Sequence, residues 1–180
     1  MTRILIVVIA LLLVSPTLAS LAAGSFPADS PRLATKTGFV GTQLIKRFEG
    51  FMPCRYIDAA GHPTIGYGHL ITELNMPECI SPERAHELLE ADLRTAERCI
   101  NHQVMSFVHQ HHFDALSSFT FNLGCGNLMT STLLRELNAD DFKGAANEFP
   151  RWNKARVNGQ LTVLRGLTLR RYAEKYVFED

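Results

Sequence analysis

Two carboxylic acids, Glu49 and Asp58, stand nine residues apart in the part of this sequence that is richest in residues suited to chemistry. Glu49 ends a stretch with helical spacing, and Asp58 opens a turn. Hydrolysis of a glycosidic bond uses two such groups: one protonates the leaving oxygen, and the other stabilises the positively charged sugar or positions the attacking water. The pair is therefore suited to glycoside hydrolysis.

The surroundings of the two acids differ in a way that fits these two roles. Glu49 lies in the last turn of its predicted helix, where the negative end of the helix dipole disfavours another negative charge. Phe48 and Phe51 would exclude water, so both effects favour the protonated form that a general acid requires. Asp58 lies in a polar turn and is expected to stay ionised. Taken alone, the two residues also fit a solvated Glu at a helix end and an Asp that caps a turn.

The residues around these acids follow an ordered pattern. It reads Phe48-Glu49-Gly50, then Tyr56-Ile57-Asp58, then Thr64-Ile65-Gly66-Tyr67-Gly68-His69. The pattern resembles the active-site segment of the phage-type lysozymes (glycoside hydrolase family 24), in which a Glu-Gly pair, an aromatic-x-Asp and a Thr-x-Gly-x-Gly-His follow at the same spacing. Later segments fit the family too, so the resemblance runs from residue 37 to the end.

The resemblance implies roles for these residues in the cleavage of peptidoglycan. Glu49 would be the general acid, Asp58 the second carboxylate, and Thr64 the hydroxyl that helps to position the catalytic water, since a hydroxyl can donate and accept at once. Gly66 and Gly68 would let the chain pass close to the sugar, or would simply form a tight turn. His69 is expected to be structural, joining the lobes through a hydrogen bond.

Arginines near the start of the last predicted helix are candidates to pair with Glu49. Relatives often carry three consecutive basic residues there, whereas Leu169 takes the first of these positions in this sequence. Arg165, Arg170 and Arg171 all remain candidates, and Arg170 is included among the predicted site residues.

The hydrophobic pattern predicts an α+β fold, and the resemblance implies a lysozyme-like one, with a small N-terminal lobe that contains the strands and a larger helical lobe. A helix is predicted over 39–48, and strands at 55–57 and 63–67 flank a turn. Ser81-Pro82-Glu83 begins a long helix, with Ser81 as its N-cap. Further helices are predicted around residues 113–123, 133–137, 142–149 and 167–177.

The N-terminus is predicted to direct export. Arg3, an apolar run and small residues up to position 23 are typical of a secretory signal peptide, and a retained signal-anchor is the alternative. Residues 1–23 are thus predicted to be the signal, 24–37 a linker and 38–180 the catalytic domain. The protein would be secreted or periplasmic, with no stable membrane association once the signal is removed.

Four cysteines in an exported chain suggest two disulfides. They are Cys54, Cys79, Cys99 and Cys125. Sequential pairing, Cys54 with Cys79 and Cys99 with Cys125, would close two modest loops. Buried free thiols are the alternative, and no ligand spacing for a metal is present.

The charges of the chain argue against a nucleic-acid partner. Lys+Arg and Asp+Glu both total 18, which leaves no excess of basic charge. His109, His111 and His112 lack further ligands, so neither a metal nor a cofactor is expected. The expected partner is bacterial peptidoglycan, bound by a monomer.

Three activities fit the resemblance. The first is a lysozyme that hydrolyses the β-1,4 bond between N-acetylmuramic acid and N-acetylglucosamine. A lytic transglycosylase would need only the Glu, so the presence of Asp58 and Thr64 argues against it. An inactive peptidoglycan-binding relative would be free to lose any of the three positions, and this sequence keeps them all.

Overall fold

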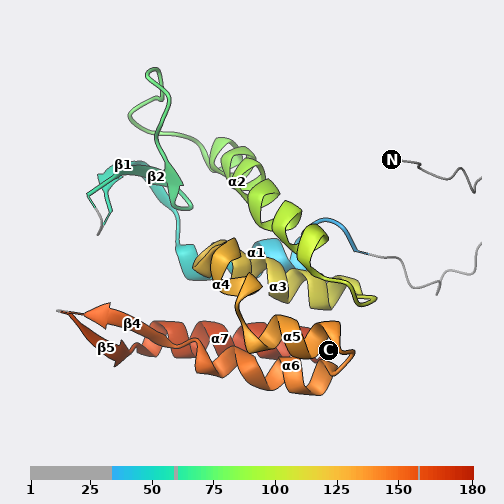
Figure 1. Ribbon diagram of the computed structural model, residues 1–180. Helices are drawn as coiled ribbons and strands as arrows, with labels where there is room; N and C mark the ends of the chain where they lie inside the picture. Colours follow the sequence, from blue (N-terminus) through green and yellow to red (C-terminus); the bar gives the residue numbers. More distant parts are fainter. Residues whose placement is uncertain (1–33, 59–60, 158) are drawn as a thin grey trace, which may run out of the picture. The chain divides into compact units, whose positions relative to one another are not determined.

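Seven α-helices and two small antiparallel sheets make up residues 34–58, 61–157 and 159–180, the part of the chain that the computed structural model describes (Figure 1). The predicted α+β class is confirmed. The predicted signal peptide and residues 24–33 of the predicted linker lie outside the described residues. Residues 34–37 already pack on the helices: Ala34 is buried, and the Thr37 amide donates to Glu97 Oε1 at 2.8 Å.

The first sheet follows directly from the first helix. Helix α1 (Phe39–Glu49) ends at Gly50, whose φ of 74° is costly for other residues. Strands β1 (Met52–Ile57), β2 (Pro63–Gly66) and β3 (His69–Leu70) then form an antiparallel sheet in that order. Its small core joins it to the next helix and consists of Ile65, Met76, Ile80, Ala85 and Leu88.

Helix α2 (Pro82–Gln103) runs from this sheet to the helical part of the chain (Figure 1). Its start is set by Ser81, whose side chain accepts a hydrogen bond from the Arg84 amide, as predicted. Its apolar stripe, from Ala85 to Ile100, is buried. Because one helix belongs to both parts, it fixes the sheet relative to the helices.

The larger core surrounds helix α3 (Gln110–Leu123). The short helix α4 (Cys125–Met129) follows it. Helices α5 (Thr132–Asn138), α6 (Phe142–Glu148) and α7 (Arg165–Phe178) pack around it together with the 3-10 turn η2 (Phe149–Arg151). The core side chains with no exposed surface include Leu116, Phe119, Leu128, Leu133 and Phe149.

Both disulfides have the predicted sequential pairing. Cys54 is bonded to Cys79 and ties β1 to the segment before α2, and Cys99 is bonded to Cys125 and ties α2 to α4. Each bond restricts the unfolded chain by closing a loop of 25 or 26 residues.

The sequence did not lead us to predict β3, α4 or the hairpin formed by strands β4 (Lys154–Val157) and β5 (Gln160–Val163). The sequence signal for the hairpin is Asn158-Gly159, a dipeptide that strongly favours a two-residue turn between strands. The last helix begins two residues earlier than predicted. Trp152 belongs to the core, as it packs edge-on against Phe119 with ring centroids 5.5 Å apart.

The described part of the chain contains neither a membrane-spanning helix nor a group of metal-binding side chains. No helix between residues 34 and 180, apart from the gaps at 59–60 and 158, is both long and apolar enough to cross a membrane. Within the same residues, no three His, Cys, Asp or Glu side chains are grouped to hold a metal.

Three histidines cluster at the start of α3. The His109 amide donates to His112 Nδ1 at 3.1 Å, and His112 lies between the rings of Phe142 and Phe178. Burial, followed by the nearby His111 and His109, lowers the pKa of His112 to about 4. A proton on His112 Nδ1 would break the hydrogen bond that caps the helix.

The stability of the protein should therefore fall as the pH drops from 6.5 to 4. In this window the unfolded chain binds a proton at His112 and the folded protein does not, so up to roughly 3 kcal/mol is lost. His112→Gln keeps an acceptor for the His109 amide but does not titrate, so it should flatten this slope in urea unfolding curves. His102→Gln, at an exposed position, should keep the wild-type slope; equal slopes in all three proteins would refute the assignment.

Candidate active site

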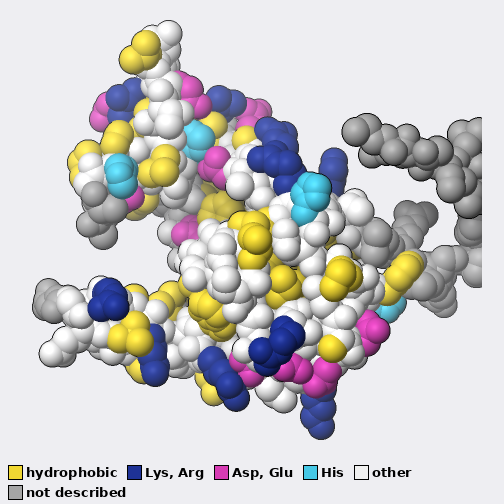
Figure 2. Space-filling model, viewed as in Figure 1, with side chains coloured by type: hydrophobic (Ala, Val, Ile, Leu, Met, Phe, Trp, Pro, Cys, Tyr) yellow, Lys and Arg dark blue, Asp and Glu magenta, His cyan; other side chains and the backbone are white. Residues whose placement is uncertain are grey.

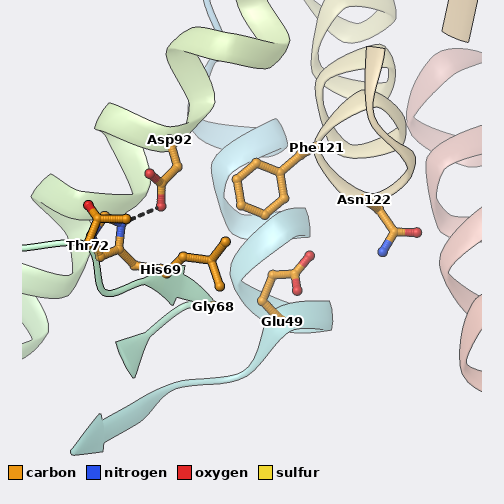
Figure 3. A pocket seen from close by; sticks show the side chains of 8 residues that line it. Glu49, Gly68, His69, Thr72, Asp92, Phe121 and Asn122 are labelled. Carbon is orange, nitrogen blue, oxygen red and sulfur yellow. Dashed lines mark hydrogen bonds and ion pairs between the residues drawn. The ribbon is translucent and has the colours of Figure 1, made fainter. Parts of the chain in front are cut away.

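Glu49, at the end of α1, lines a cavity of about 490 Å³ between the sheet and the helices (Figure 3). Phe121 and Asn122 of α3 lie on one side of it, and Asp92 of α2 lies on another. The sheet side is formed by Gly68, His69, Leu70 and Thr72. The cavity is large enough for a small ligand. Its lining is mainly polar, with Glu49, His69, Thr72, Asp92 and Asn122 beside Leu70 and Phe121.

Arg170 is the arginine that pairs with Glu49. Its Nη1 lies 2.7 Å from Glu49 Oε1, and its side chain is almost fully buried. Further hydrogen bonds from Arg170 to Glu174 and to the Ser118 carbonyl hold it in place. The ion pair thus fixes one carboxyl oxygen of Glu49 at the wall of the cavity.

The other two candidate arginines have different surroundings. Arg171 is fully buried and donates to Glu174 at 2.7 Å and to Asn122 at 3.1 Å. Arg165 is exposed in the first turn of α7. Leu169, at the position where relatives often carry a basic residue, is also exposed.

Thr64 lies on β2, and Asp58 directly follows β1. Tyr56 pairs with Thr64 across β1 and β2, and the Asp58 amide donates to the His62 carbonyl. Because opposite residues of an antiparallel pair share a face, Tyr56 and Thr64 are on the same side of the sheet, and Asp58 lies two residues beyond Tyr56, just after the end of β1. Burial, and then the negative charges of Asp58 and Glu49, raise the pKa of Tyr56. Tyr56 thus lies within the electric field of both carboxylates.

The side chains of Asp58 and Thr64 both interact with the backbone of His62. Asp58 Oδ1 accepts from the His62 amide at 2.8 Å. The Thr64 hydroxyl is buried and donates to the His62 carbonyl at 3.1 Å. Since its hydrogen is used in this bond, the Thr64 oxygen has its lone pairs left to accept another hydrogen bond.

The two glycines of the motif have different surroundings. A side chain at Gly66 would meet Ala85 of α2 at 3.2 Å, so this glycine allows the sheet to pack on the helix. Gly68 lines the cavity, and a Cβ there would lie 3.9 Å from Glu49 Oε2. Both have positive φ angles, which other residues rarely adopt. Only Gly68 keeps the space beside the acid open.

His69 connects the sheet to α2. Its Nδ1 lies 2.9 Å from Asp92 Oδ2, the contact drawn in Figure 3, and its Nε2 lies 3.6 Å from Glu73. The contact joins β3 to α2. Asp92 could not be identified from the sequence, because no local signal marks a partner 23 residues away. It also missed Tyr56, Phe121 and Asn122 as site residues, although each lies within a quoted motif or predicted helix.

Comparisons with known proteins agree with this geometry. A family model for phage lysozyme matches residues 46–174. The endolysin of Acyrthosiphon pisum secondary endosymbiont phage 1 is 43% identical over 140 residues, which is 78% of this chain and 95% of that protein. A SAR-endolysin of bacteriophage PS119 is 36% identical over 129 residues, covering 72% of this chain and 75% of the relative.

A solved structure supports the same assignment. The muramidase domain of SpmX from Asticaccaulis excentricus superimposes with a TM-score of 0.75 at 35% identity, and the match covers 81% of this chain and 98% of that domain. The chain therefore belongs to the phage lysozyme family and is a glycoside hydrolase that degrades peptidoglycan.

Proposed function

We propose that this lysozyme cleaves the β-1,4 bond between N-acetylmuramic acid and N-acetylglucosamine with Glu49 as its general acid. The observation that carries the proposal is the position of Glu49, whose carboxyl group lines the cavity and is held by Arg170 at 2.7 Å. A carboxyl group held in this position can donate a proton to the glycosidic oxygen of a sugar chain bound in the cavity.

Asp58 and Thr64 would act on the water and on the developing positive charge. Support comes from Tyr56, which pairs with Thr64 across the strands and whose pKa is raised by burial and by the charges of Asp58 and Glu49. The Thr64 oxygen can accept a hydrogen bond from a water molecule, which would turn a lone pair of that water toward the sugar carbon. The carboxyl group of Asp58 would stabilise the oxocarbenium-like transition state or remove the proton of the water.

Asp58→Asn should reduce turnover by roughly 100-fold or more, since it removes one of the two carboxylates that this chemistry uses. The measurement is the clearing of a peptidoglycan suspension, with the products read by mass spectrometry. Asp140→Asn, in an exposed turn between α5 and α6, is the matched control and should keep full activity.

The product masses test the reaction class. Hydrated reducing ends from the wild-type protein would establish hydrolysis. Anhydro products would mean that the protein is a lytic transglycosylase, and cell-wall binding without clearing would mean that it only binds peptidoglycan. Full activity in Asp58→Asn would reject Asp58 as the second carboxylate.

We further propose that the protein acts outside the cytoplasm. The N-terminal sequence has the order of a secretory signal, two disulfides are formed, and disulfides persist mainly in oxidising compartments. N-terminal sequencing of the exported protein separates cleavage between residues 19 and 23 from a retained signal-anchor, and recovery only from the cytoplasm would contradict export.

A further inference from the structure

The β4–β5 hairpin carries a face on which basic and apolar side chains alternate. Lys154 pairs with Val163 across the strands, and Arg156 pairs with Leu161. Cross-strand partners share a face, so these four side chains form one surface, and all four are exposed. Figure 2 shows basic and hydrophobic side chains side by side on this hairpin. We call these four residues the hairpin face.

An exposed two-stranded hairpin has little stability of its own, yet this one has a firmly held base. The Leu164 amide donates to the Asn153 carbonyl at 2.9 Å, and the Asn153 side chain donates to Thr168 in the first turn of α7. Trp152, just before β4, packs on Phe119 in the main core. The hairpin is therefore presented in a defined position.

The base of the hairpin adjoins α7, the helix that carries the partner of Glu49. Arg165 follows β5 almost directly, and Arg170, the partner of Glu49, lies about 7.5 Å farther along the axis of α7. In the space-filling view the surface is hollowed between the hairpin and the part of the chain that contains β1 and β2 (Figure 2). A polymer that passes Glu49 through this hollow would pass beside the hairpin.

The charges on the two sides of the hollow differ in sign. Strands β4 and β5 carry Lys154 and Arg156 and no acidic residue. Residues 50–80 carry one arginine, Arg55, which pairs with Glu78, and two further acids, Asp58 and Glu73. An anionic group on the substrate would be attracted to the hairpin side and repelled from the sheet side. The alternating valine and leucine side chains add apolar contact for methyl-bearing groups.

We propose that the hairpin face binds the stem peptide of peptidoglycan, the short acidic peptide attached to N-acetylmuramic acid. This inference rests on the proposed function, which places the muramic acid residue next to Glu49. The stem peptide carries free carboxylates and small apolar side chains, such as that of alanine, and these match the cations and apolar residues of the hairpin face. The hairpin thus distinguishes peptide-bearing glycan from bare glycan.

The test compares two substrates and two double variants. The substrates are intact sacculi and the soluble glycan strands that remain after an amidase has removed the stem peptides. The first variant is Lys154→Gln/Arg156→Gln. The charge-matched control, Arg98→Gln/Lys143→Gln, removes the same two charges from exposed positions on α2 and α6.

The hairpin variant should raise the apparent KM on sacculi roughly fivefold with kcat unchanged, because exposed charge contacts are individually weak and act on binding alone. On bare strands both constants should equal those of the wild type, and the control should match the wild type on both substrates. Co-sedimentation with sacculi should weaken by the same factor in the hairpin variant only, and this readout does not require turnover.

Three results would overturn the proposal. An equal loss on both substrates would mean that the hairpin contacts the glycan or supports the fold. An equal loss in the control would mean that only net charge matters, and unchanged KM and co-sedimentation would mean that the hairpin face does not bind substrate. A wild-type protein that co-sediments normally but cleaves neither substrate would contradict the proposed function and leave the binding comparison valid.

Discussion

Glu49→Gln is expected to abolish clearing of peptidoglycan. Turnover should fall by about 1,000-fold or more, a loss within the range that general acid catalysis contributes. The amide cannot deliver a proton to the glycosidic oxygen. It keeps the shape of the side chain and an oxygen that can accept the hydrogen bond from Arg170, so the site should stay assembled. Turnover on sacculi, measured by the release of reducing ends, gives the result.

Two controls separate chemistry from folding in this experiment. Glu87→Gln, which removes an exposed ion pair with Arg84 on α2, should leave activity unchanged. The Glu49→Gln protein should also bind sacculi as the wild type does. Its unfolding free energy should differ by less than about 1 kcal/mol, because the Glu49 side chain is 22% exposed and solvent screens the loss of its charge, whereas Glu174 is fully buried. Retained turnover in a folded Glu49→Gln protein would remove Glu49 from the mechanism.

The parts of the fold that were predicted correctly are those that short-range signals specify. Gly50 and Gly124 end helices where a positive φ is needed, and Ser81 caps α2 through its own hydroxyl. Each of these depends on a few neighbouring residues, so the sequence alone is sufficient. The order and spacing of the Glu49 to His69 motif likewise survive in the structure as one helix end and one sheet.

The parts that could not be predicted depend on packing between distant segments. Arg170 and Arg171 are adjacent, and a helix turns by about 100° between them, so they point in different directions. Which of them reaches Glu49 therefore depends on the orientation of α7 against α3. Ser118 of α3 helps to settle it, because it accepts from Arg170 on its carbonyl oxygen and bonds Glu174 through its hydroxyl. The β4–β5 hairpin was not predicted for a different reason: its turn signal, Asn158-Gly159, is present in the sequence and was overlooked.

Beneath the site, α7 buries an unusual amount of charge. Glu174 and Arg171 have no exposed side-chain surface, and Arg170 has 4%. One oxygen, Glu174 Oε1, accepts from Arg170, from Arg171 and from Ser118. With Glu49 included, two positive and two negative charges balance, and the Arg171 guanidinium also lies 5.2 Å from the centre of the Phe119 ring. Burial raises the pKa of Glu174 and lowers that of Arg171 to about 10.

Glu174→Gln should consequently lower the unfolding free energy by about 3–5 kcal/mol, the cost of removing one partner of a buried ion pair. The amide oxygen can occupy the place of Oε1, so the geometry is kept while one buried positive charge loses its balance. For a domain of this size the midpoint of thermal unfolding should fall by roughly 10 °C. Calorimetry or thermal melting followed by circular dichroism measures this.

A matched control lies at the C-terminal end of the same helix. Glu179→Gln removes the exposed ion pair with Lys175 by the same chemical change, and it should cost less than about 0.5 kcal/mol. If both variants lost the same small amount, the buried cluster would not stabilise the fold. A large loss confined to Glu174→Gln would mean that the arginine which holds Glu49 is fixed by this buried balance of charge, so that the stability of α7 and the placement of the catalytic acid depend on the same residues.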